Sequence, residues 1–102
     1  MNPERTSRNW MIWKAYYCHP ESTLESVGQS YEVTRERIRQ VIYKVDRKYM
    51  RDEISRLKTL VELSNINDSP DDIRIVKAII NKDLPDKWYI NHIRLYRRNH
   101  HE

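Results

Sequence analysis

The segment 23–49, TLESVGQSYEVTRERIRQVIYKVDRKY, constrains the fold of this chain more than any other part. It contains Gly28, the only glycine among 102 residues, within a stretch that has helical apolar spacing. Glycine inside a helix costs about 1 kcal/mol relative to alanine, so a single glycine placed there indicates a packing requirement. A close crossing of two helices meets it, because only a very small side chain fits at the contact. We therefore predict two short helices joined by a tight turn.

The other apolar residues of the segment fit the same hairpin. We expect the inner side to be formed by Val27, Tyr31, Val33, Ile38 and Val41, with Val33 filling the turn. Start signals precede both helices. Ser22-Thr23-Leu24-Glu25 is a capping-box pattern, and its free backbone N–H groups can also hold a phosphate. Thr34 follows the turn and is expected to cap the second helix.

Positive charge is concentrated on the second of these helices. The chain has a net charge of +4, and residues 34–51 hold seven Lys or Arg against two acids. The rest of the chain is therefore slightly acidic overall. A basic patch confined to one element is the distribution expected of a protein that binds nucleic acid.

The outward face of the second helix mixes donors and acceptors. At about 100° per residue, Glu36, Gln40, Tyr43 and Arg47 lie opposite Ile38, with arginines and Lys44 beside them. Arginine pairs with guanine, glutamine with adenine, and glutamate accepts a hydrogen bond from cytosine. An acid on the centre line opposes sequence-independent phosphate binding and therefore favours base reading. The alternative is a solvated, salt-bridged face, which the spacing of the preceding helix and turn disfavours. The flanking cations would contact phosphates.

Within this segment, TLESVGQSYEVTRERIRQ resembles the helix-turn-helix of region four of bacterial sigma-70-type factors, which reads the promoter −35 element. Thr34–Gln40, TRERIRQ, is the most specific run, and the resemblance covers residues 22–49. Beyond Gln40 the family usually has a polar residue and alanines where this chain has Ile42, Tyr43 and Val45. The resemblance implies a role in transcription. The expected DNA-binding residues are Ser22, Thr23, Thr34, Arg35, Glu36, Arg37, Arg39, Gln40, Tyr43, Lys44 and Arg47.

The rest of the chain also reads as helical. Residues 7–18 place Trp10, Trp13 and Tyr17 on one face, and core packing explains these aromatics better than base stacking on single strands. From Thr34 the apolar stripe shifts by one residue near 49–52, which indicates either a helix that changes its buried face or a break. The shifted stripe is Met50, Ile54, Leu57 and Val61, and it suits intramolecular packing or a homodimer seam.

Two further helices are expected in the second half. Ser69-Pro70-Asp71-Asp72 is a helix start, with a cap, proline at the first position and acids in the first turn. We expect this helix to bury Ile73, Val76, Ile79, Ile80 and Leu84. Residues 87–98 follow Pro85. The run WYINHIRLY is rich in strand-forming residues, so helix and strand remain alternatives there, with helix favoured.

Several classes of function find no support in the sequence. Cys18 is the only cysteine, which allows no internal disulfide and suits a reducing, cytoplasmic setting. No apolar run approaches the roughly 18–20 residues needed to cross a bilayer. The histidines, His19, His92, His100 and His101, lack metal-ligand spacing. Since no phosphate loop or catalytic constellation is recognisable, we expect neither a cofactor nor an enzyme.

We therefore predict a small all-α protein with two parts. Residues 1–49 form a helix-turn-helix domain, and residues 50–102 form a helical extension for dimerisation or partner binding. The favoured function is a sequence-specific double-stranded DNA-binding transcription regulator of phage or mobile-element type. One alternative is a sigma-mimicking protein that binds or inhibits RNA polymerase or its sigma factor. Another is a DNA-packaging recognition subunit, in which helices after the helix-turn-helix form an oligomer.

Overall fold

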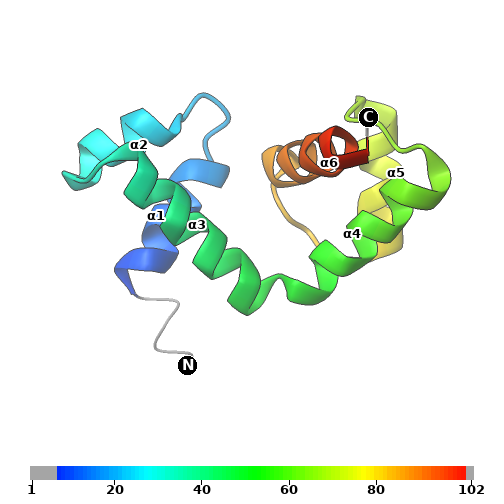
Figure 1. Cartoon of the computed structure of the whole chain (residues 1–102), viewed down its shortest axis with the longest axis horizontal. Coiled ribbons are helices and arrows are strands. Elements are labelled where there is room, and N and C mark those ends of the chain that lie inside the picture. The colour runs from blue at the N-terminus through cyan, green and yellow to red at the C-terminus, as the bar shows by residue number, and fades with distance from the viewer. Residues whose placement is uncertain (1–6, 101–102) are drawn as a thin grey trace. The chain divides into compact units, whose positions relative to one another are not determined.

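The computed structural model describes residues 7–100, with side chains described through Arg98, and this part contains six helices and no strand (Figure 1). The all-α prediction is confirmed. The chain divides between Met50 and Arg51 into two compact units, one residue past the predicted boundary. Met50 is the C-terminal cap of one helix and Arg51 begins the next, so of the two alternatives for residues 49–52 a break is the one that is present.

The first unit contains α1 (Arg8–Tyr17), α2 (Leu24–Tyr31) and α3 (Arg35–Tyr49). α1 and α2 both pack against α3 and also touch each other. The core is formed by Ile12, Trp13, Tyr17, Val27, Ile38, Val41, Ile42, Val45 and Met50. α3 therefore carries most of the shared apolar surface, while its opposite side remains in solvent.

α1 keeps its aromatic residues in the core, as predicted. Trp13 and Tyr17 are buried, while Trp10 is half-buried and stacks on Trp13 with ring centroids 5.2 Å apart. Trp10 also meets the ring of Tyr49 edge-on, at 5.5 Å. These rings bind α1 to α3 rather than forming an open stacking surface.

The second unit contains α4 (Arg51–Ser64), α5 (Pro70–Ile80) and α6 (Asp86–His100). Residues 87–98, for which helix and strand were the alternatives, lie in α6 and are helical. In α4, Leu57 is fully buried and Val61 nearly so, so these two residues serve intramolecular packing rather than a homodimer seam. Trp88 and Tyr89 are fully buried at the start of α6. Aromatic area of this size accounts for much of the stability of a small unit.

Polar contacts join the helices and loops of the second unit. Lys82 pairs with Glu53 at 2.9 Å, and Arg94 pairs with Asp68 at 2.5 Å. The Tyr89 hydroxyl donates to the carbonyl of Lys82 at 2.6 Å. Burial raises the pKa of Tyr89 to about 12, so this phenol stays protonated and remains a donor at neutral pH.

One core prediction for α5 is wrong. Ile79 is 52% exposed rather than buried. The buried face of this helix is set by Ile73, Val76 and Ile80, and Ile79 lies about 100° from its centre. Ser69 and Pro70 open the helix as predicted, with the Ser69 hydroxyl accepting from the Asp72 amide.

Candidate nucleic-acid interface

Gly28 lies where α2 meets the turn and the start of α3. A Cβ built on it would stand 2.7 Å from the carbonyl oxygen of Val33 and 3.4 Å from the carbonyl carbon of Thr34. The first distance is shorter than real Cβ contacts, and the atom it meets belongs to the backbone. The close approach inferred from the sequence is therefore present. It falls on the turn and the first residues of α3 rather than on the middle of that helix.

The turn itself has a left-handed residue. Glu32 ends α2 with φ 58° and ψ 43°, a conformation usually taken by glycine. The Val33 amide then donates to the Gly28 carbonyl at 2.9 Å. Arg8 adds a contact from α1, because its guanidinium donates to the Tyr31 carbonyl at 2.5 Å. The end of α2 is thus held from within the turn and from a neighbouring helix.

The start of α2 differs from the predicted capping box. Thr23, not Ser22, is the N-cap, and Ser26, not Glu25, is its reciprocal partner. The Ser26 amide donates to the Thr23 hydroxyl at 3.0 Å, and the Thr23 amide donates to the Ser26 hydroxyl at 2.9 Å. Ser22 instead belongs to the preceding turn, where its amide donates to the His19 carbonyl. The extended conformation that a cap requires therefore comes one residue later than expected.

α3 begins at Thr34 as predicted, and its hydroxyl accepts from the Arg37 amide at 3.1 Å. Ile38 is fully buried, and Val41, Ile42 and Val45 continue the buried face. The predicted outward residues all lie in solvent: Arg35, Glu36, Arg37, Arg39, Gln40, Tyr43, Lys44 and Arg47. The structure therefore brings eight of the predicted DNA-binding residues onto one helix surface, which we call the outward face. Thr34 stands at its start, while Thr23 and Ser22 lie at the start of α2.

Glu36, Arg39 and Gln40 contact one another on the outward face. The Arg39 guanidinium donates to both carboxylate oxygens of Glu36, with a shortest distance of 2.6 Å. Gln40 adds a weak hydrogen bond to the same carboxylate at 3.4 Å. The guanidinium holds the pKa of Glu36 below its ordinary value of 4.5. Glu36 therefore stays ionised at neutral pH and stands as an acceptor beside two donors.

Asp46, the second acid of α3, was not singled out by the sequence analysis. It is buried, and the indole N–H of Trp13 donates to its carboxylate at 2.9 Å. A polar acceptor buried in a core requires such donors. The bond joins α1 to α3, and Asp46 does not lie on the outward face. Together with the Glu36–Arg39 pair, this leaves the exposed charge of α3 dominated by Arg35, Arg37, Lys44, Arg47 and Lys48.

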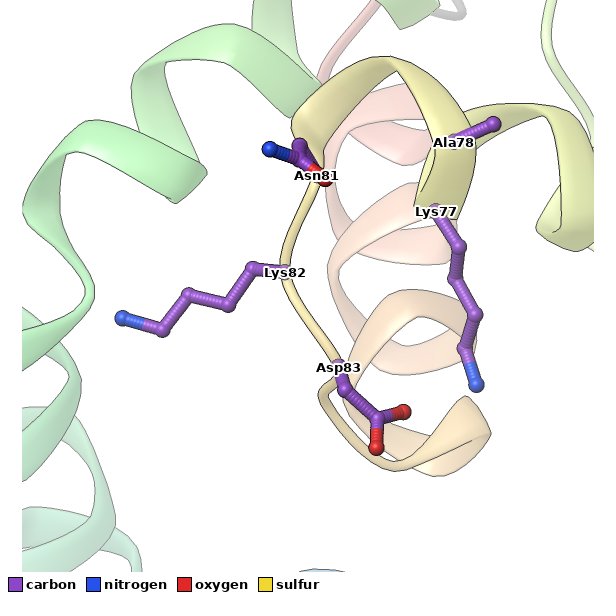
Figure 2. Close-up of a pocket in the computed structure, with 5 residues that line it drawn as sticks. All are labelled: Lys77, Ala78, Asn81, Lys82 and Asp83. Carbon is purple, nitrogen blue, oxygen red and sulfur yellow. The ribbon is translucent and has the colours of Figure 1, made fainter.

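Other parts of the described chain offer weaker candidate sites. A shallow hollow beside the end of α5 is lined by Lys77, Ala78, Asn81, Lys82 and Asp83, and the two lysines point away from one another (Figure 2). Lys77 already pairs with Asp86 at 2.7 Å and Lys82 with Glu53. The hollow therefore has no converging reactive groups.

Among the residues that the structure describes, no group of three or more His, Cys, Asp or Glu is placed to hold a metal ion. His101 lies outside those residues, and the side chain of His100 is not described. No helix in the same part of the chain is long and apolar enough to cross a bilayer.

Comparisons of the chain with protein families, characterised proteins and solved structures found no match. The likeness of residues 22–49 to sigma region four therefore rests on those residues alone.

Proposed function

We propose that this protein binds double-stranded DNA in a sequence-specific manner and regulates transcription, with α3 in the major groove. The observation that carries the proposal is the outward face of α3. One side of the helix is buried on α1 and α2, and the other exposes guanidinium, amide, carboxylate and phenol groups. A major groove about 12 Å wide admits one α-helix, whose side chains then reach the base edges.

The α2–α3 hairpin supports this role. Two short helices are joined by the turn at Glu32–Thr34. Gly28 permits α2 to approach this turn and the start of α3 closely. In a helix-turn-helix the second helix enters the groove and the first helix crosses the backbone. α3 and α2 suit these two roles. The Thr23 hydroxyl, at the start of α2, still has a hydrogen to donate to a phosphate.

The chemistry of the outward face separates base reading from phosphate binding. Glu36 and Gln40 are suited to base edges, because a carboxylate accepts from cytosine and an amide pairs with adenine. Arg35, Arg37 and Lys44 flank them and are suited to phosphates. A surface that served phosphates alone would gain nothing from an ionised carboxylate at its centre.

Selection of bound duplexes from a random pool, followed by gel shifts, tests the proposal. We expect a defined site with −35-like character. Gln40→Ala should cost about 1–3 kcal/mol on that site and relax the preference there, whereas Lys44→Ala should weaken binding to every duplex alike. Both side chains are exposed on α3, so the two variants are matched for folding. Recovery of no consensus at moderate salt would refute the proposal.

A second candidate is contact with RNA polymerase or its sigma factor through the second unit. The observation that favours it is exposed apolar surface there, at Leu63, Ile75, Ile79 and Leu95. Pull-down of polymerase beside a gel shift distinguishes the two candidates. Capture of polymerase without a shift would support protein contact in place of DNA reading.

A further inference from the structure

Tyr43 is the one residue of the outward face with an extended apolar surface. Its side chain is 59% exposed on the centre line of α3, between Gln40 and Arg47. The packing of the first unit does not account for an aromatic ring here, because Tyr43 is exposed and lies outside the buried face of α3.

Arg47 stands over this ring. Its guanidinium carbon lies 5.4 Å from the Tyr43 ring centroid, one helical turn further along α3. A cation placed over an aromatic face is attracted by the ring quadrupole. The contact favours this arrangement of the two side chains over others. Ordering before binding reduces the entropy that a contact would cost.

The length of α3 places these residues along the groove. At about 1.5 Å per residue, Tyr43 lies roughly 10 Å beyond Glu36 and Arg47 roughly 16 Å beyond it. Glu36, Gln40, Tyr43 and Arg47 share the outward face. When a helix lies in the groove with Glu36 over one base pair, Tyr43 therefore faces base edges farther along the groove, and Arg47 lies one helical turn beyond it.

The chemistry of the groove then identifies the target of the ring. Of the groups that the four bases expose in the major groove, the 5-methyl of thymine is the apolar one. We propose that Tyr43, braced by Arg47, packs against the 5-methyl group of a thymine and selects a T·A pair beside the pairs read by Glu36 and Gln40. This inference rests on the proposed DNA-binding function and adds a recognition element to it.

Replacing each thymine of the selected duplex singly by deoxyuridine tests the inference, because this change removes only the methyl group. Binding of the full chain is measured for the wild type, Tyr43→Ser and Tyr43→Phe. Losing one buried methyl contact should lower wild-type affinity about fourfold at a single position. Tyr43→Phe should keep this effect, and Tyr43→Ser should abolish it at that position alone. Since Tyr43 is exposed, circular dichroism should show unchanged folding for both variants.

The outcomes separate the two proposals. Failure to recover any preferred duplex would refute DNA reading as a whole. A preferred duplex whose uridine scan is the same for wild type and Tyr43→Ser would overturn the methyl contact while leaving DNA reading intact. A Tyr43→Phe variant as weak as Tyr43→Ser would also overturn it, because the hydroxyl would then be the binding group, donating to a phosphate.

Discussion

Gly28→Ala tests the geometry on which the candidate interface depends. In an unconstrained helix the change would stabilise α2 by about 1 kcal/mol. Here the new methyl group would stand 2.7 Å from the Val33 carbonyl oxygen, and a backbone oxygen cannot rotate away as a side chain can. Overpacking of this kind costs about 1–3 kcal/mol. The shift it forces also strains the bond from the Val33 amide to the Gly28 carbonyl, which contributes about 1 kcal/mol.

These opposing effects predict a net destabilisation of about 1–3 kcal/mol for Gly28→Ala, measured by urea denaturation of the full chain. Amide hydrogen exchange gives a local readout, because the Val33 amide should lose protection. The matched control is Gln29→Ala, the next residue of α2, whose side chain is exposed. It should leave stability within about 0.5 kcal/mol of wild type. If Gly28→Ala proves as stable as the control and keeps Val33 protected, the close-approach argument is refuted.

Three further predictions concern the first unit. Trp13→Phe removes the donor to the buried Asp46 and should cost about 2–4 kcal/mol in denaturation experiments; a loss under about 0.5 kcal/mol would show that the bond is unimportant. Glu32→Gly relieves a left-handed residue and should stabilise the protein by about 0.5–1 kcal/mol, whereas destabilisation would mean that the Glu32 side chain matters more than its backbone. Arg39→Ala should raise the pKa of Glu36 toward 4.5 in an NMR titration. Because a lowered folded pKa contributes stability that is lost only as pH falls through it, this pair should add no pH dependence between about pH 6 and 8.

Local signals in the sequence predicted the fold best. Thr34 and the Ser69-Pro70 start are short-range patterns, because a cap and the helix it opens are set by neighbouring residues. The apolar stripe shifts at the break at Met50, although the shift also allowed a continuous helix that changes its buried face. These features depend on the spacing of residue types along the chain, which can be read from the sequence. Even here the cap of α2 was misplaced by one residue, since both Ser22 and Thr23 can cap a helix and Glu25 completes the capping-box pattern only with Ser22.

The features that were missed depend on contacts between distant residues. Asp46 and Trp13 are 33 positions apart, and neither residue type indicates that the carboxylate will be buried and accept a hydrogen bond from the indole. One signal was available: Asp46 lies near the apolar side of α3, about 80° from Ile38. Ile79 shows the opposite failure, because its periodicity indicated burial while the packing of α5 left it half-exposed.

The outward face was predicted residue by residue, yet its internal bonding was not. The sequence places Glu36, Arg39 and Gln40 three and four positions apart, a spacing that permits contact in any helix. Whether such side chains join each other or remain extended depends on solvent and on rotamers, and spacing does not determine these.

The bond between Glu36 and Arg39 affects how strongly α3 would discriminate between base sequences. Glu36 and Arg39 are already hydrogen-bonded to each other in the unbound protein. A poorly matched base pair therefore leaves neither side chain without a hydrogen-bond partner. A well-matched pair gains only the difference between the new bonds and the old ones. Base reading by Glu36 and Arg39 would therefore distinguish matched from mismatched base pairs by a smaller free-energy difference than reading by side chains that exchange no bond.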